Sequence, residues 1–524
     1  MGRLNISKLW QHIKNSVDWP LAIFLVLFLH VSLGVKALAV VFMYVMRPNF
    51  KFGFGSGRLP MFYALMVCFA VVQLLVNFSR GLNYQLLGML VLSFWVVSFL
   101  VMHQLKYAIE KSGVDKVSRT LDVFFVLNAL VSAWDLIRIM WSIHDINPYT
   151  FDGLSYKYSA STGDYIKGLS RDLSTVNMIT NALGLVYYFL KGRYWMATLC
   201  FVVAVFTTSN LGNIILFIFF AYVLFFGRSG FNRSLILCYI GFMVFFIVKI
   251  SPSNLNYMNH KFTELLHLKE PIIKVHFEDN KVKEDLINRY IYKYHKELIN
   301  RQKQAVVEEK IFNLREKVDS VPKTDTVYVQ EMNSMQLHFA AFYMQHYGDT
   351  TKLKDAYYFS KPGKMLSFFE TMDFLKSGVS HFLIGAGGGN FSSKLAYKAS
   401  NLGVSGKYVQ KYAYIAPEFK AHHLKLSMSY FLKSSTEHSI INSPNSTLNQ
   451  LLGEYGVVGL LLFLVFYVAY FLQRFKQLSF GRVLLPVCLI FMLTDYWFES
   501  MSILILFELL MFVDLETKKE LVHD

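Results

Sequence analysis

The sequence predicts an all-α membrane protein that crosses the bilayer about twelve times and carries one large helical domain outside it. Of the 524 residues, 54% are hydrophobic and 16% are aromatic, and the mean hydropathy of +0.36 is typical of a polytopic membrane protein. The apolar residues form long runs separated by short basic turns. A single long polar segment, residues 251–441, interrupts these runs and predicts the external domain.

The first half of the chain contains clear apolar runs at residues 61–78, 82–105, 121–141, 173–190, 194–206, 211–226 and 234–250. The strongest positive-inside signal lies between the second and third runs and consists of Lys106, Lys111, Lys116 and Arg119. These residues predict a cytoplasmic loop. The parity of the crossings then places residues 142–172 and 251–441 on the opposite side of the membrane.

Two regions leave the number of crossings open. Residues 20–45 could form one long helix or two short ones, and residues 484–512 contain one or two further crossings, with Asp495 and Glu499 in the middle. Counting both regions as hairpins gives about twelve spans with both termini in the cytoplasm.

The polar segment is too long and too regular for a linker. Apolar residues recur at helical spacing over residues 282–318, which predicts a long amphipathic helix or a helical hairpin. Residues 336–347 and 365–375 predict shorter helices. The predicted organisation is residues 1–250 for the N-terminal transmembrane helices, 251–445 for the large loop domain, and 446–524 for the C-terminal transmembrane helices and tail.

Composition also limits the function. The net charge is +16, but the basic residues are dispersed among apolar helices, so nucleic acid is not an expected partner. All four cysteines fall in apolar segments, which leaves no disulfide framework and no thiolate metal site in the polar segment. No set of His, Asp and Glu residues has the spacing of metal ligands, so we expect no metal.

Residues 442–464, reading NSPNSTLNQLLGEYGVVGLLLFL, join the polar segment to a membrane helix. Ser443 is predicted as the N-cap and Pro444 as the first helical residue, which places Asn445, Asn449, Leu452 and Gly456 on one helical face. A stripe of small residues at Gly453, Gly456 and Gly459 would let another helix approach closely. The helix N-terminus could hold a phosphate, and a capped helix start without chemistry is the simpler interpretation.

Residues 382–391 read FLIGAGGGNF and place four glycines in five positions. Such a run exposes backbone amides and permits close approach of a phosphate or a sugar, although a tight turn between two helices has the same composition. No Walker lysine follows, so the run does not predict nucleotide binding.

Both stretches resemble the signatures of bacterial O-antigen polymerases and O-antigen ligases. In that family a His-Asn pair precedes a Leu-rich turn and a Glu-x-Gly-x-x-Gly run, and the matching residues are Gln450, Leu451, Leu452, Glu454, Gly456 and Gly459. Asn445 stands at the position of the family His, and Ser446 at that of its Asn. The family's Gly-x-Gly-x-Gly-Asn-Phe segment is matched by Gly385, Gly387, Gly389, Asn390 and Phe391.

Three further positions extend the resemblance. Residues 168–183 are similar to the family's Gly/Arg-to-Asn segment at the entry to a membrane helix, which contains Arg171 here. Lys364 is the nearest equivalent of an Arg that the family tends to place at the start of the short helix before the glycine run. Residues 206–217 resemble a Thr/Ser-Arg turn, with Asn210 where Arg is common. For Arg171 and Lys364, interfacial snorkelling or a solvated loop position is the alternative.

The resemblance implies periplasmic glycosyl transfer from an undecaprenyl-pyrophosphate-linked glycan, in a multi-pass protein of the bacterial inner membrane whose large helical domain is periplasmic. The reaction would polymerise repeat units of O-antigen or a related surface polysaccharide and needs no cofactor. Besides the donor lipid and the bilayer, a chain-length regulator and a flippase are the partners that this activity implies.

The resemblance also implies roles for individual residues. Arg171 and Lys364 would bind phosphate, and Gly385, Gly387, Gly389 and Asn390 would surround phosphate or sugar. Asn445 would orient the acceptor or donor, while His422, His423 and Glu454 would contact substrate. Because Asn445 cannot accept a proton near neutral pH, we expect His438 to be the general base, although a surface position is the common fate of a lone histidine.

Two other functions stay open. A ligase would move the finished glycan onto lipid A–core, and the family His missing at Asn445 favours the polymerase over it. A lipid-linked oligosaccharide flippase would be expected to line a central path with many intramembrane charges, whereas this chain places few there, namely Asp135, Arg138, Asp495 and Glu499.

Overall fold

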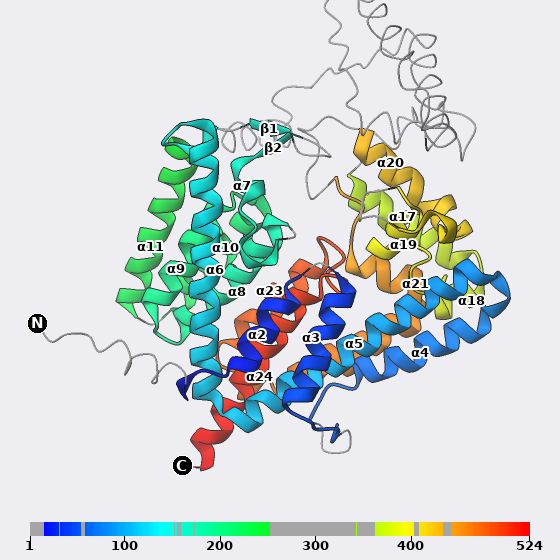
Figure 1. Ribbon diagram of the computed structural model, residues 1–524, viewed down its shortest axis with the longest axis horizontal. Helices are drawn as coiled ribbons and strands as arrows, with labels where there is room; N and C mark the ends of the chain where they lie inside the picture. The colour runs from blue at the N-terminus through cyan, green and yellow to red at the C-terminus, as the bar shows by residue number, and fades with distance from the viewer. Residues whose placement is uncertain are drawn as a thin grey trace, which may run out of the picture.

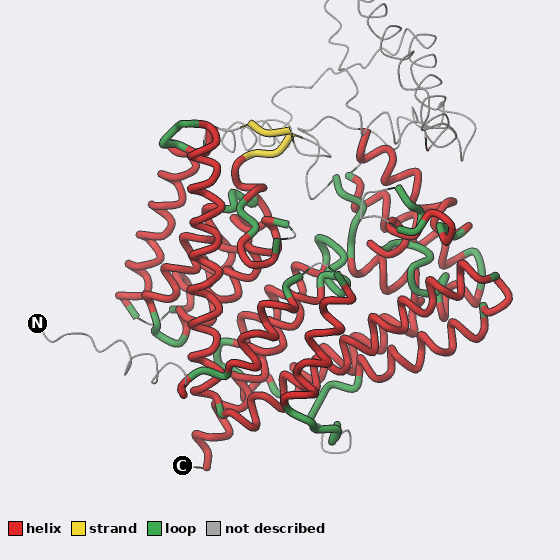
Figure 2. The backbone as a smooth tube through the Cα atoms, in the orientation of Figure 1, coloured by secondary structure: helices red, strands yellow, loops and turns green. Residues whose placement is uncertain are grey.

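The computed structural model describes residues 15–30, 32–53, 58–150, 152–154, 159–171, 173–227, 229–251, 342, 362–402, 408–432 and 442–523. This part of the chain folds into helices apart from one antiparallel hairpin of β1 (Asp152–Leu154) and β2 (Ser159–Ser161), as Figure 2 shows. The all-helical fold class is therefore confirmed for these residues.

Four stretches within the described residues are long and apolar enough to cross a membrane. They are α5 (Leu82–Ser112), α6 (Val114–Ile143), Gly230–Ile250, which begins with α11 (Gly230–Phe245), and Thr447–Gln473, which begins with α21 (Thr447–Phe463). Shorter apolar helices accompany them, including α2 (Trp19–Phe28), α3 (Leu33–Met46), α4 (Phe62–Val76), α9 (Tyr194–Phe206) and α23 (Gly481–Met492). This helix content suggests a multi-pass membrane protein.

The helices form three neighbouring groups in Figure 1. One group contains α6, α8 (Ser174–Leu190), α9, α10 (Asn210–Phe226) and α11, and the middle group contains α2, α3, α23 and α24 (Met501–His523). The third group contains α4, α5, α21, α17 (Gly363–Lys376), α18 (Val379–Ile384), α19 (Lys394–Ala399) and α20 (Lys425–Leu432). Because α24 packs against α5, α6 and α8, it joins the groups.

The prediction of a loop between the second and third apolar runs is wrong. Helix α5 continues through Lys106 and Lys111 to Ser112, and α6 begins at Val114. Gly113 makes the whole turn with a φ of +77°, a backbone conformation that glycine adopts without strain. The basic residues therefore lie on two helix ends, and the buried Lys106 pairs there with Glu516 of α24.

Both uncertain terminal regions contain two helices. Helices α2 and α3 pack against each other, and the buried Asp18 holds the start of this pair because its carboxylate accepts from Leu21 N and pairs with Arg47. In the second region, α23 ends at Met492 and α24 begins at Met501. Asp495 and Glu499 thus lie in the connection between two helices rather than inside one.

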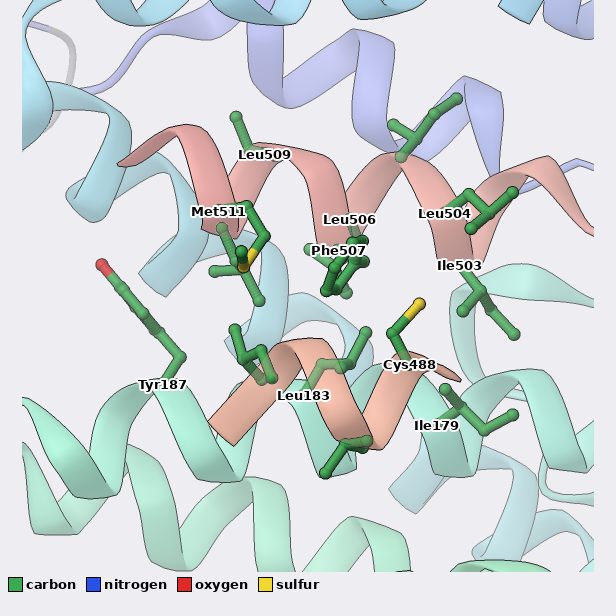
Figure 3. Packing of buried hydrophobic residues seen from close by; sticks show 14 of the residues in the cluster. Ile179, Leu183, Tyr187, Cys488, Ile503, Leu504, Leu506, Phe507, Leu509 and Met511 are labelled. Atoms are coloured by element: carbon green, nitrogen blue, oxygen red, sulfur yellow. The ribbon is translucent and has the colours of Figure 1, made fainter. Parts of the chain in front are cut away.

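Helix α24 lies at the centre of the core. All its residues from Met501 to Leu515 are buried, and all of them except Ser502, Glu508 and Asp514 are apolar or aromatic. Figure 3 shows Leu506, Phe507 and Met511 of α24 facing Ile179 and Leu183 of α8. In a bilayer such close packing stabilises a helix mainly through van der Waals contact.

The polar segment is described only in part. The helix predicted over residues 365–375 is confirmed as α17. The helix predicted over residues 282–318 lies outside the described residues, as does the one over 336–347 apart from residue 342. In the described part of this segment, α17 and α18 pack against α21, and Figure 1 draws α19 and α20 beside α17.

Candidate functional site

Helix α21 begins later than predicted. Its N-cap is Ser446, whose side chain makes no capping hydrogen bond, and Thr447 is the first helical residue. The predicted N-cap at Ser443 and first helical residue at Pro444 are therefore wrong. The physical reason is that the Lys364 ammonium takes the backbone carbonyls of Ser443 and Asn445, which keeps this segment out of the helix.

The predicted helical face of Asn445, Asn449, Leu452 and Gly456 is also wrong, because Asn445 precedes α21 and the helix breaks at Gly456. This residue has a φ of +64°, and a Cβ there would lie 2.4 Å from the carbonyl oxygen of Leu383. A Cβ on Gly453 would lie 1.9 Å from a ring carbon of Phe391. Two glycines of the predicted small-residue stripe therefore admit α18 and the residues that follow it.

The glycine run from Gly385 to Gly389 donates hydrogen bonds to α21 beside its break at Gly456. The amides of Ala386 and Gly387 donate to the carbonyls of Gly453 and Glu454 at 2.8 and 3.0 Å, and the amide of Gly388 donates to Gln73 Oε1 at 3.2 Å. Gly385, Gly387 and Gly389 have φ values of +69°, +95° and +74°. These positive φ values require glycine. The amides of Ala386, Gly387 and Gly388 are already hydrogen-bonded within the protein.

The carboxylate of Glu454 occupies the concave side of the glycine run. Glu454 is 1% exposed and accepts from Phe391 N at 3.3 Å, and the amides of Gly389 and Ser392 face it too. The run thus surrounds a carboxyl group that belongs to the protein itself. Asn390, equally buried, donates from its side-chain amide to the carbonyl of Gly388 at 3.1 Å.

Lys364 ties three segments together. Its ammonium donates to Thr494 O at 2.8 Å and to Ser443 O at 3.4 Å, besides Asn445 O. An ammonium has three N–H donors, so these three carbonyls account for all of them. Burial lowers the pKa of Lys364 to about 8, and the carboxylate of Asp495 opposes this change. Lys364 therefore joins α17, the segment before α21 and the connection between α23 and α24.

The connection between α23 and α24 carries a second lysine contact that sequence reasoning missed. Lys394, the first residue of α19, donates to Ser500 Oγ at 2.7 Å and lies 3.9 Å from Asp495 Oδ2. Its side chain is 28% exposed. The position five residues after the glycine run was the only signal for Lys394 in the sequence. Asp495 and Glu499 were noted as charges in an apolar region.

Glu499 completes this set. Its carboxyl accepts from Gln450 Nε2 at 2.9 Å and from Leu395 N at 3.0 Å. Burial, reinforced by the nearby Glu454 carboxyl, raises the pKa of Glu499 to about 8. We name Lys364, Lys394, Asp495 and Glu499 the lysine–carboxylate cluster. The cluster offers one partly exposed ammonium to an anion, and it contains one buried carboxyl that is protonated near pH 7.

The two neighbouring histidines differ. His422 lies with Nδ1 2.9 Å from Glu370 Oε2, while Lys425 lies 3.3 Å from the other oxygen of the same carboxylate. The His422 side chain is 23% exposed. His423 is fully buried against the Phe391 ring, and burial lowers the pKa of His423 to about 3. His423 is therefore a neutral core residue, and only His422 is placed to meet a substrate.

Arg171 lies elsewhere. It pairs with the buried Asp135 of α6 at 3.0 Å, and Gly168 N donates to the same carboxylate at 3.2 Å. Its own side chain remains 55% exposed. The turn just before Arg171, Gly168–Ser170, packs against α6 and α8, whereas Figure 1 draws α17 beside α19 and α20. This conformation therefore does not bring Arg171 and Lys364 together.

Two predicted site residues remain, His438 and Asn445. His438 lies outside the described residues, as does its neighbour Glu437. Asn445 is half-buried, and its backbone rather than its side chain makes the contacts given above. Among the residues that the structure describes, no three His, Cys, Asp or Glu side chains lie close enough to hold a metal ion.

No family model, curated protein or solved structure matches this chain. Fold and site together define a helical protein with several possible membrane crossings and a polar cluster at the start of an apolar helix. The resemblance to the O-antigen enzymes stays a prediction carried by the sequence motifs.

Proposed function

We propose that the protein is a glycosyltransferase of the bacterial inner membrane that polymerises undecaprenyl-pyrophosphate-linked repeat units into O-antigen or a related surface polysaccharide. The proposal includes about twelve membrane spans and a periplasmic loop domain. The observation that supports it best is the position of the lysine–carboxylate cluster where the apolar helix α21 meets the polar helices α17 and α19. A lipid-linked sugar diphosphate requires this combination, because its tail lies in the bilayer and its charged head at the interface.

The proposed reaction is a displacement at the anomeric carbon of the donor. A hydroxyl oxygen of the acceptor sugar forms the new glycosidic bond, and the bond between the anomeric carbon and the pyrophosphate oxygen breaks. Undecaprenyl pyrophosphate leaves with the bonding electrons, and the hydroxyl proton passes to a general base. Lys394 would stabilise the leaving group in this conformation, and such stabilisation requires neither a nucleotide nor a metal.

The base in this proposal is His438, as the sequence predicts. The structure offers His422 as the next candidate, because Glu370 orients its imidazole through Nδ1. Among the described residues, the other ring nitrogen of His422 has no hydrogen-bond partner. A base that is held by a carboxylate and keeps one nitrogen open has the arrangement that proton abstraction needs.

The decisive experiment supplies the purified protein with a synthetic lipid-linked repeat unit, with and without lipid A–core. The proposal predicts products of several repeats that form without lipid A–core. Lys394→Ala should lose most of this activity, whereas Lys398→Ala, an exposed lysine on the same helix, should retain it. The two variants have the same charge, so general electrostatics cannot explain a difference between them.

Two outcomes would point to the other functions. Transfer that occurs only when lipid A–core is present would identify a ligase. Movement of the lipid-linked unit across a bilayer without any new glycosidic bond would identify a flippase.

A further inference from the structure

An apolar groove lies between α21 and α23. It has a volume of about 270 Å³ and is lined mainly by leucines, among them Leu451 and Leu460 of α21 and Leu489 of α23. Leu464, Ile490 and Leu493 also line it and are 44%, 36% and 52% exposed, so the groove is open on its outer side. Its wall on α21 belongs to a stretch that is long and apolar enough to cross a membrane, so the open side faces the region of lipid chains.

One end of the groove meets the lysine–carboxylate cluster. Thr447 lines the groove, and its hydroxyl donates to the carbonyl of Asp495 at 2.7 Å. Leu493 also lines the groove and directly precedes Thr494, whose carbonyl accepts from Lys364. The groove is therefore apolar along its length and ends at Thr447, beside the backbone of Thr494 and Asp495. Thr494 accepts from Lys364 through its carbonyl, and the Asp495 carboxylate lies 3.9 Å from Lys394.

We infer that this groove holds the first part of the single isoprenoid chain of a polyprenyl diphosphate, with the diphosphate at Lys394. This inference rests on the proposed function and specifies which part of the protein binds the donor lipid. The charge of Lys394 is complementary to that of a diphosphate. Lys394 is the partly exposed cation of the cluster, and the carboxylate oxygen of its neighbour Asp495 lies 3.9 Å away. A diphosphate would compete with Asp495 for this ammonium.

The size of the groove favours a polyprenyl lipid over a phospholipid. Its volume of about 270 Å³ lies just below the range of roughly 300–1,000 Å³ that is usual for pockets of drug-sized ligands. It therefore accommodates one chain segment, whereas a phospholipid brings two acyl chains to the same headgroup. Since a tail already lies in hydrocarbon, the groove contributes orientation of the headgroup more than hydrophobic affinity.

The test uses the full chain in nanodiscs of phosphatidylethanolamine and phosphatidylglycerol with added undecaprenyl diphosphate, and native mass spectrometry to measure the bound lipid. Leu489→Trp fills the groove, and Leu461→Trp is its control, because Leu461 is 51% exposed and lies outside the lining. Leu460→Trp fills the groove from the opposite wall and replaces Leu489→Trp if that variant fails to fold.

We expect wild-type protein and Leu461→Trp to retain undecaprenyl diphosphate, and the groove-filling variants to retain on the order of tenfold less. Equal retention by all variants, or phosphatidylglycerol bound in its place, would overturn the inference. The measurement involves no glycan and no transfer. If lipid binding is normal but the polymerisation assay fails, only the proposed function is rejected. If polymerisation is normal and Leu489→Trp binds the lipid as wild type does, only the groove is rejected.

Discussion

Two pairs of like residues show how differently the same chemistry is used in this protein. Lys364 donates to three backbone carbonyls and His423 is fully buried, so both belong to the packing of the fold. Lys394 and His422 keep 28% and 23% of their side chains exposed, and each lies next to a carboxylate. A motif identifies residue types with a suitable chemistry, and the neighbouring backbone decides which of them can reach a substrate.

The largest expected effect concerns the general base. His438→Ala should reduce turnover about 100- to 10,000-fold and leave binding of the donor lipid unchanged, because it removes proton transfer alone. Polymer formation and donor binding, measured in parallel on His438→Ala and His422→Ala, test this. If His438→Ala polymerises normally and His422→Ala does not, the base is His422 with Glu370. If both are active, Glu437 or Glu370 becomes the next candidate.

The two lysines should separate stability from function. Lys364→Met leaves three carbonyls without their donor and should lower the free energy of unfolding by about 3 kcal/mol. Lys394→Met should cost less than about 1 kcal/mol, since its ion pair is long and partly exposed. Thermal unfolding in detergent measures the stability of both variants, and donor binding measures the functional loss expected of Lys394→Met. Equal loss of stability in both variants would contradict the distinction between the two lysines.

Sequence patterns predicted the helical fold because apolar runs are long and basic turns are frequent, and they located the helix now seen as α17. They missed the turn at Gly113, which is a local conformation of one glycine, and the late start of α21, which depends on tertiary contacts. Lys364 reaches its carbonyls across 79 to 130 positions of sequence, a partnership that no local pattern encodes. Motif spacing therefore found the glycine run, and only the fold assigned its amides to Glu454 and α21.

The second predicted phosphate ligand offers a sharper comparison. If the exposed part of Arg171 binds pyrophosphate, Arg171→Lys should lower transfer about tenfold, since a lysine lacks the planar fork that binds two oxygens. Arg119→Lys, on the exposed side of α6, is the control and should change little. Polymer length in cells with normal protein levels provides the measurement. Wild-type polymer in an Arg171→Ala strain would remove this residue from the site.

Glu499 predicts a pH dependence of stability. Its pKa is raised to about 8 in the folded protein, so between its ordinary value of 4.5 and about 8 the native state binds the proton more tightly than the unfolded chain. The contribution of Glu499 is then complete below about pH 4.5 and is lost as the pH rises to about 8, with a slope of up to about 1.4 kcal/mol per pH unit. Glu499→Gln should remove this slope. Thermal unfolding across this pH range measures the slope. If variant and wild type show the same slope, it belongs to other groups.

The smallest effects are expected at the start of α21. A side chain that caps a helix contributes about 1 kcal/mol, but Ser446 makes no capping hydrogen bond, and Ser443 accepts only a long one, at 3.4 Å, from Asn445 N. Ser443→Ala and Ser446→Ala should therefore each change the free energy of unfolding by less than about 0.5 kcal/mol. Ser393→Ala is the matched comparison, because Ser393 caps α19 by accepting from Ala396 N at 3.0 Å, and it should cost about 1 kcal/mol. A larger loss for Ser443→Ala than for Ser393→Ala would mean that the Lys364 contacts do not hold this segment and that the helix begins at Ser443 after all.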